Sequence, residues 1–388
     1  MRMTIRDLGY VPGQLAPGEK NSILDVPGVH VGQVTVGQDG SDFLKGVTVI
    51  MPRHPDDIYT PCYAGMHTLN GNGEVTGWYQ VKDWGFINTP IALTNSCSLG
   101  TVFQESWTWI LERSKRMGLS VNDISHNYGT PIVGETADWW LNDVYQSMIE
   151  AKDVKQAFAN TLTQTEVQEG QFGGGAGMTC HMFPGGTGTS SRVVDALEGN
   201  KKYTVGVLCQ SNYGLKIDMN IAGIPMGRML VKENSAKEAE RAKSTPGGKA
   251  DDGSIVIILI TDAPMLPHQL TRLAQHATVG LSQVGGHGTG RTHSGDIFLA
   301  VSTANTPNEV NSVAHVNGVS KVEHNTVELI KNESIDTLFR AASEATEEAI
   351  LNSMVAGREG RVGHGGLHLE GLPVEKVRAW LKQYQVVV

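Results

Sequence analysis

The sequence predicts a layered αβ protein in which sheets of buried strands are covered by helices. Short apolar runs separated by Gly, Pro and Asp turns fill the first hundred residues, a pattern typical of β-strands. The second half of the chain alternates strand-like and helix-like segments. One run, IVIILI over 255–260, is mostly β-branched and has no polar side chain, which predicts a strand buried on both faces.

The elements expected in the first half are strands followed by helices. Apolar runs at 29–36 and 46–51 predict two strands. Residues 101–118 predict an amphipathic helix, because apolar side chains recur there at helical spacing and a glycine ends the pattern. We expect a second helix over 141–158 and, after two glycine clusters, a strand at 203–209.

In the second half, a helix is expected over 266–280, a strand over 296–302, a long helical region over 328–356 and a last helix over 374–384. The chain shows no internal repeat, and we expect residues 1–388 to form a single domain.

Composition narrows the class of protein. The chain has 388 residues, 40% hydrophobic and 18% charged, which fits a compact protein. Its formal net charge is −9 and it has no basic run, so nucleic acid is not an expected partner. No stretch reaches the roughly 18 apolar residues of a membrane span, and the N-terminus lacks the apolar core of a signal peptide. The four cysteines form no CxxC pair, so we expect a soluble cytoplasmic protein without disulfides.

A polar segment over 232–253 interrupts the apolar pattern. It reads KENSAKEAERAKSTPGGKADDG and has hardly any apolar side chain beyond alanine. This composition predicts a solvated, flexible linker with a short helix at its start. The linker ends abruptly, because Ser254 is followed at once by the buried run 255–260.

A serine between an accessible linker and a rigid strand is placed to attack the peptide bond before it. Ser254 Oγ would attack the Gly253 carbonyl, where no Cβ hinders the approach, and hydrolysis of the resulting ester would leave Ser254 as a new N-terminus. Its α-amine has a reference pKa of about 7.7–8.0, so one residue would supply both nucleophile and base. Taken alone, the local pattern favours an ordinary turn entering a strand, since Asp, Gly and Ser dominate turns.

Several long motifs occur in order along the whole chain. They are TIRDLG (4–9), ILDVPGVHVGQ (23–33), LNGNGE (69–74), PIVGET (131–136), GGTGTSSR (185–192), SNYG (211–214), DGSIVIILITDAPMLPHQLTRLA (252–274) and SGDIFLAVSTAN (294–305). Through them the chain resembles the DmpA-type aminopeptidases, the L-aminopeptidase/D-esterase family that includes the β-peptidyl aminopeptidases. The resemblance implies a four-layer αββα sandwich of the kind shared with ornithine acetyltransferase and similar to N-terminal nucleophile hydrolases. It also implies self-cleavage into an α chain, 1–253, and a β chain, 254–388, which stay associated and assemble as homotetramers.

The resemblance also assigns residues of the site around Ser254. Ser294 matches the family's second serine and Asp296 its acidic position, so we expect Ser294 to hydrogen-bond the Ser254 amine or hydroxyl and Asp296 to orient that pair. Asn212, in SNYG, would donate to the oxyanion, a contribution of about 3–4 kcal/mol. Glu135, in PIVGET, is our candidate for binding the substrate's ammonium group; a structurally paired carboxylate is the alternative.

Trp140 is the point where the chain departs from the family pattern. Relatives often carry a tyrosine that contributes to the oxyanion site, in a segment that here reads DWWLND at 138–143. An indole offers one N–H donor and no hydroxyl. Either Trp140 takes over the role, or Asn212 and backbone N–H groups carry the charge. The change bears on substrate preference more than on reaction type.

Three other patterns carry less weight. GGHGTGRT at 285–292 nearly matches a phosphate-binding loop, but it has arginine in place of lysine and no strand leads into it. The 13 histidines show no metal-ligand spacing, so neither a metal nor a cofactor is expected. Asp262 and His268 hint at a catalytic triad with Ser254, yet no G-x-S-x-G turn supports it.

We therefore predict a self-cleaving serine aminopeptidase that releases N-terminal residues from short peptides, amides or esters, with β-amino acid and D-alanyl compounds as candidate substrates. Two alternatives stay open. An acyltransferase of the ornithine acetyltransferase type would use threonine as its nucleophile, so Ser254 argues against it. An uncut binding homologue would follow if Trp140 disturbed the site.

Overall fold

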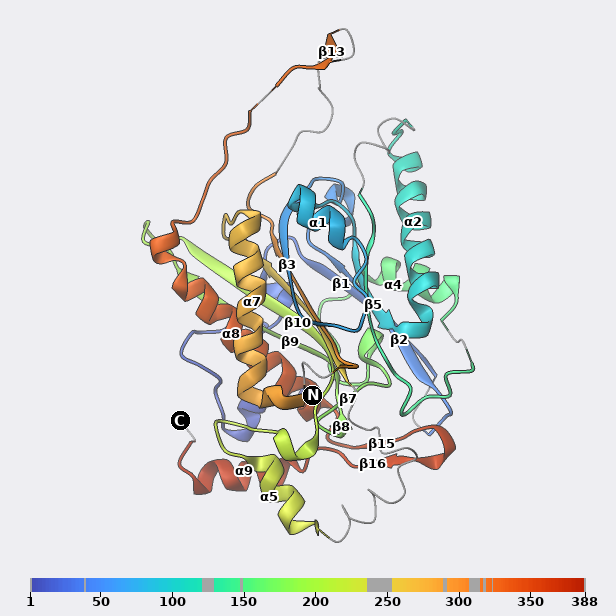
Figure 1. Ribbon diagram of the computed structural model, residues 1–388, viewed down its shortest axis with the longest axis vertical. Helices are drawn as coiled ribbons and strands as arrows, with labels where there is room; N and C mark the ends of the chain where they lie inside the picture. Colours follow the sequence, from blue (N-terminus) through green and yellow to red (C-terminus); the bar gives the residue numbers. More distant parts are fainter. Residues whose placement is uncertain are drawn as a thin grey trace.

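Two main sheets form the centre of the computed structural model (Figure 1), which describes residues 2–37, 40–120, 129–146, 149–235, 253–288, 292–306, 315–316, 319–322 and 324–386. One sheet has four strands, in the order β1 (His30–Gly37), β2 (Leu44–Met51), β5 (Ile91–Asn95) and β6 (Ile132–Thr136). The other has six, in the order β4 (Phe86–Ile87), β3 (Cys62–Gly71), β12 (Gly295–Ser302), β11 (Ser254–Thr261), β10 (Lys202–Asn212) and β9 (Gly186–Asp195).

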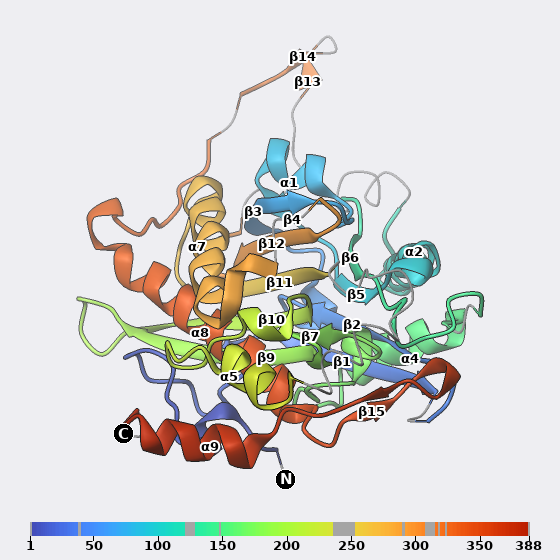
Figure 2. The ribbon, with the colours of Figure 1, turned by 60° about the horizontal axis from the view of Figure 1, so that its bottom comes forward.

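Helices cover the outer face of each sheet, so the molecule has four layers, seen edge-on in Figure 2. The four-stranded sheet packs against α2 (Leu99–Arg116) and α4 (Ala151–Asn160), and the six-stranded sheet against α7 (Pro267–Gly285) and α8 (Asp336–Ala356). The inner faces of the two sheets meet across an apolar layer. This arrangement confirms the predicted αββα sandwich.

Shorter elements complete the described chain. The helices are α1 (Trp78–Trp84), α5 (Met226–Glu233) and α9 (Val374–Gln383). The ribbons are β7 (Thr179–Cys180) with β8 (Phe183–Pro184), β13 (His315–Val316) with β14 (Val319–Ser320), and β15 (Arg361–Val362) with β16 (His368–Leu369). None of the described helices is long and apolar enough to cross a bilayer.

The central strand β11 is buried along its whole length. Its side chains alternate between the two apolar layers, because successive residues of a strand point to opposite faces. Ile255, Ile257 and Leu259 pack in the layer that contains α7 and α8. Val256, Ile258 and Ile260 pack in the layer between the sheets. The run 255–260 is therefore buried on both faces, as its composition predicts.

Two helix predictions are wrong at their starts. The helix expected over 141–158 begins only at Ala151, because the Asn142 side chain docks its segment onto β2. Its Oδ1 accepts the Leu44 N–H at 2.8 Å and its Nδ2 donates to the Leu44 carbonyl at 3.0 Å. The helical region expected from 328 begins at Asp336, since the preceding Ile330 N–H donates to the Pro264 carbonyl at 2.9 Å in an extended segment.

The linker predicted over 232–253 lies mostly outside the described residues, which stop at 235 and resume at 253. Its first two residues belong to the end of α5, at Glu233. The other elements predicted from the sequence are present close to their expected positions, whereas strands β3, β5, β6 and β9 had no individual prediction. The four cysteines are free thiols, and three of them are buried.

A buried ionic network ties the N-terminal segment to α8. The Arg192 guanidinium, which is fully buried, lies 2.7 Å from Glu348 and 3.3 Å from Glu344. Arg6 reaches the same Glu348 carboxylate at 2.5 Å. Burial by itself would raise the pKa of Glu348, but Arg6 and Arg192 hold it below its ordinary value. Residues from both sides of the Gly253–Ser254 junction therefore share one network.

We predict that Arg192→Met lowers the free energy of unfolding by about 3–5 kcal/mol, because it leaves buried carboxylates without their main counter-charge. Urea unfolding of variants in a Ser254→Ala chain would measure this on one intact polypeptide. Arg378→Met is the control: this arginine is partly exposed and pairs with the exposed Glu375, and its loss should change stability by no more than about 0.5 kcal/mol. Equal effects of the two substitutions would contradict the prediction.

Candidate active site

Strand pairing places Ser254 beside Asn212. Ser254 is the first residue of β11 and Asn212 is the last residue of β10. The two are directly opposite in the antiparallel register. Opposed residues of antiparallel strands project their side chains from the same face of a sheet. The observed strand β10 extends three residues beyond the C-terminal end of the strand predicted over 203–209, and this extension brings Asn212 next to Ser254.

The neighbouring strand β12 supplies the groups on the other side of Ser254. It runs parallel to β11, with Ile255 opposite Asp296. The Gly295 N–H donates to Ser254 Oγ at 3.1 Å. The Ser294 hydroxyl donates to the carboxylate of Asp296, whose oxygens lie 2.8 and 2.9 Å away. The Ser254 hydroxyl thus accepts a backbone N–H from Gly295, a partner that could not be singled out from the sequence. The expected contact of Ser294 with the Ser254 amine or hydroxyl stays a prediction.

Gly253 lies in a position that admits no side chain. A Cβ there would come within 2.4 Å of the Asn212 carbonyl oxygen and 2.5 Å of Tyr213 Cα. Glycine at 253 therefore serves two purposes: it leaves its carbonyl open to attack, and it allows the junction to pass close to the end of β10.

The side-chain amide of Asn212 is held at both ends. Its Nδ2 donates to the Ala137 carbonyl at 2.6 Å, and its Oδ1 accepts the Thr179 N–H at 2.9 Å. An asparagine amide carries two N–H donors, so one hydrogen remains to serve a ligand next to Ser254. Both Asn212 and Ser254 are buried, with 6% and 7% of their surface exposed. A buried donor stabilises a developing charge more strongly than one in water.

Glu135 ends in a half-buried carboxylate on β6. Its Oε1 accepts the Glu74 N–H at 2.9 Å, and its Oε2 accepts the Ser96 hydroxyl. A Cβ at Gly73 would lie 3.4 Å from Glu135 Oε1 and 3.2 Å from Gly295 Cα. Gly73 therefore lies between the Glu135 carboxylate and Gly295, whose N–H binds Ser254 Oγ.

The segment 69–74 joins these groups, a role that the sequence did not reveal. The Asn70 side chain donates to the Ser294 carbonyl, and so does the Asn72 N–H at 3.1 Å. Glu74 holds Glu135. The only sequence signal was a stretch rich in Asn and Gly after an apolar run, which marks a turn without naming its partners.

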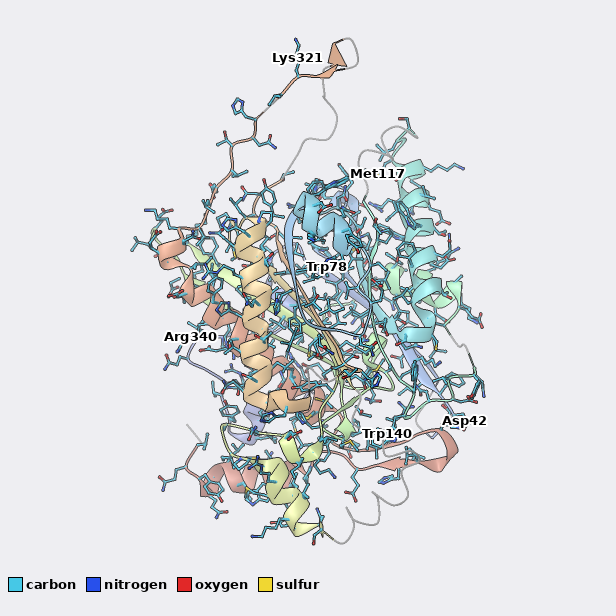
Figure 3. All side chains as sticks on the ribbon, viewed as in Figure 1. Asp42, Trp78, Met117, Trp140, Lys321 and Arg340 are labelled. Atoms are coloured by element: carbon cyan, nitrogen blue, oxygen red, sulfur yellow. The ribbon has the colours of Figure 1, made fainter. Side chains whose placement is uncertain are left out.

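Trp140 lies half-buried in the segment after β6, toward β15 in Figure 3. Its neighbour Trp139 is 63% exposed. The segment is anchored on either side of the indole by two buried residues, Asp138 and Asn142, which bond to each other at 2.8 Å.

The residues of the triad hypothesis lie away from the serine. Asp262 directly follows the last residue of β11, at the opposite end of the strand from Ser254, and its Oδ1 accepts the Thr204 N–H at 2.7 Å. His268 is exposed in the first turn of α7. The glycine-rich stretch 285–292 follows a helix instead of a strand, and its residues 289–291 lie outside the described chain. Among the residues that are described, no three His, Cys, Asp or Glu side chains gather as a metal site.

Two facing sheets with helical covers, and a serine at the start of the central strand, define the class of serine hydrolases with the N-terminal nucleophile fold. The chain belongs to peptidase family S58, which it matches over residues 21–366. It is 40% identical to the β-peptidyl aminopeptidase BapA of Sphingosinicella microcystinivorans over 98% of this chain and 92% of that protein. It is 35% identical to BapA of Sphingosinicella xenopeptidilytica, over 97% and 90% of the two chains.

Solved structures agree with this assignment. The β-aminopeptidase of a Burkholderia species has a TM-score of 0.82 at 40% identity, over 98% of this chain and 99% of that one. The L-aminopeptidase/D-Ala-esterase/amidase of Ochrobactrum anthropi, described as a prototype of the serine aminopeptidases with a variant of the Ntn hydrolase fold, has a TM-score of 0.83 at 35% identity, over 99% of both chains. The protein is therefore a serine aminopeptidase of this fold.

Proposed function

We propose that the chain cuts itself between Gly253 and Ser254 and then uses Ser254 as an N-terminal nucleophile. The observation that carries the proposal is the position of Ser254, which begins the buried strand β11 with its Oγ held by the Gly295 N–H and with Asn212 opposite. In the first step, Ser254 Oγ bonds to the Gly253 carbonyl carbon, the C–N bond breaks and the hydroxyl proton ends on the freed amine. Water then cleaves the ester, which leaves a carboxylate on Gly253 and a free Ser254.

The same groups account for aminopeptidase turnover. The Ser254 α-amine takes the Oγ proton as Oγ attacks the substrate carbonyl, and returns it to the leaving amine; water then hydrolyses the acyl-enzyme. The remaining amide hydrogen of Asn212 stabilises the oxyanion. Asp296 orients Ser294, whose hydroxyl then hydrogen-bonds the Ser254 amine once cleavage has freed it.

Glu135 is our candidate for binding the substrate's ammonium group. Two donors already fix its carboxylate, yet an ionised carboxylate has about four acceptor positions, so it can take a further N–H. This gives the enzyme its preference for a free N-terminus. The same two donors also fit the structural alternative, in which Glu135 only ties β6 to segment 69–74. A substitution of Glu135 should raise KM if it binds substrate and leave KM unchanged if its role is only structural.

Substrates with a β-amino acid or a D-alanyl residue at the N-terminus are the ones we propose to test first. Relatives are named as β-peptidyl aminopeptidases and as an L-aminopeptidase/D-Ala-esterase/amidase. A panel of L-, D- and β-aminoacyl p-nitroanilides would rank them.

The acyltransferase alternative has no counterpart among these relatives, and the uncut binding alternative is disfavoured by the ordered contacts of Ser254, Ser294, Asp296 and Asn212. We propose that Trp140, which stands where relatives often carry a tyrosine, alters the oxyanion site and with it the substrate preference.

We propose a cytoplasmic location and a tetrameric assembly for the protein. Free thiols at all four cysteines support a reducing cytoplasm. The family resemblance supports a homotetramer of processed αβ units. Light scattering on the purified protein would test the assembly: four times the mass of one chain agrees with it, and a single-chain mass contradicts it.

We predict that Ser254→Ala leaves one uncut chain without aminopeptidase activity, because both cleavage and turnover need the hydroxyl. Denaturing electrophoresis and hydrolysis of an aminoacyl p-nitroanilide would measure the two effects. Ser282→Ala, which alters an exposed serine on α7, is the matched control and should cleave and turn over normally. Turnover by Ser254→Ala would refute the nucleophile assignment.

We predict that Glu135→Gln lowers kcat/KM by about 10- to 100-fold, mainly through KM, since a hydrogen bond to a charged group is worth about 1.5–3 kcal/mol. The substitution keeps the side chain's size and one oxygen acceptor. Glu112→Gln, on the exposed side of α2, is the control. An unchanged KM for Glu135→Gln would favour the structural alternative.

A further inference from the structure

Arg361 lies between the two segments that hold the Asn212 amide. It belongs to β15 and is only 2% exposed. Its Nη2 donates to Asn142 Oδ1 at 2.9 Å, and its Nη1 donates to Gln171 Oε1 at 3.0 Å. The two nitrogens of one planar guanidinium thus fix two different side-chain amides.

The Asn142 branch leads to the Ala137 carbonyl. Asn142 Nδ2 donates to Asp138 Oδ2 at 2.8 Å, and Lys45 Nζ lies 3.7 Å from the same oxygen. Lys45 and Asp138 are buried, and burial raises the pKa of Asp138 against the opposing effects of Lys45 and Asn142. Asp138 directly follows Ala137, whose carbonyl accepts the Nδ2 of Asn212. Fixing Asp138 therefore fixes the acceptor that orients the Asn212 amide.

The Gln171 branch leads to the Thr179 N–H. Gln171 Nε2 donates to the Met178 carbonyl at 2.8 Å, and its Oε1 accepts the Gly177 N–H at 3.1 Å. These bonds hold the peptide that connects Met178 to Thr179. The Thr179 N–H is the donor to Asn212 Oδ1. Both ends of the Asn212 amide are thereby connected, through short chains of hydrogen bonds, to the same guanidinium.

We infer that Arg361 is a positioning residue, which sets the orientation of the Asn212 amide toward Ser254 by holding both of its hydrogen-bond partners. The inference rests on the proposed function, because it matters only if Asn212 stabilises the oxyanion. Arg361 comes from the 254–388 part of the chain, whereas Asn142, Gln171 and Asn212 come from the part before the proposed cut. After cleavage, the second fragment would lock the oxyanion donor of the first.

The test is a double-mutant cycle on the full protein, with kcat and KM measured on the best aminoacyl p-nitroanilide and divided by the amount of free Ser254 terminus. Asn212→Ala should lower kcat about 10²- to 10³-fold. Arg361→Met should lower kcat about 10- to 100-fold with KM little changed, since misplacing a catalytic group by about 1 Å costs up to about 100-fold. Adding Arg361→Met to Asn212→Ala should cost nothing more, because the donor it positions is already gone.

Two further variants separate positioning from general damage. Arg361→Lys keeps the charge but lacks the planar guanidinium that places two nitrogens against the two amides, so its kcat should lie between those of wild type and Arg361→Met. Arg358→Met removes a neighbouring arginine whose side chain, within the described part of the chain, bonds to the Val355 carbonyl and pairs with Glu359, and it should behave as wild type. If Arg361→Met is not recovered in cleaved form, the kcat of Arg361→Lys alone tests the positioning role. Its melting temperature, compared with that of wild type, shows that the variant is folded.

A wild-type kcat in either Arg361 variant, or losses that multiply in the double variant, would overturn the positioning role. Failure of the proposed function looks different. In that case the wild type would not hydrolyse aminoacyl amides, or Asn212→Ala would retain full activity.

Discussion

Burial of β11 on both faces is the constraint on which the rest of the structure depends. Its alternating side chains fill the layer between the sheets and the layer under α7 and α8 at once. A strand held in this way cannot shift by one residue without turning each side chain to the opposite layer. Its first residue, Ser254, therefore has a fixed place relative to β10 and β12, and the chemistry proposed for it depends on that fixed place.

The site is assembled from strand ends, each of which brings one group. The end of β10 brings Asn212, the start of β12 brings the Gly295 N–H, and β6 brings Glu135. Segment 69–74 bonds to the backbone before β12 and to the Glu135 carboxylate, so it joins Glu135 to the strand end that holds Ser254. Such positions are rigid, because the sheets have already ordered the backbone that presents them.

The fold class, the central strand and the main helices could be predicted from the sequence, because they follow from apolar periodicity. The junction before Ser254 could not be told from a turn by local pattern, and only motifs along the whole chain made it a candidate cleavage site. Contacts between distant segments could not be predicted. The Asn142 amide stops the expected helix at 141 by docking on β2, and Arg361 meets Gln171 from 190 positions away. In both contacts, the local sequence around one residue does not indicate which distant residue it will meet.

Ser254 can become an N-terminus only if the Gly253–Ser254 bond is cut. Intact-mass spectrometry of the purified protein under denaturing conditions shows directly whether this happens. We expect two polypeptides, with masses of residues 1–253 and 254–388, and a precursor that disappears with time. A single mass of the 388-residue chain after long incubation, or a cut at another bond, would contradict it.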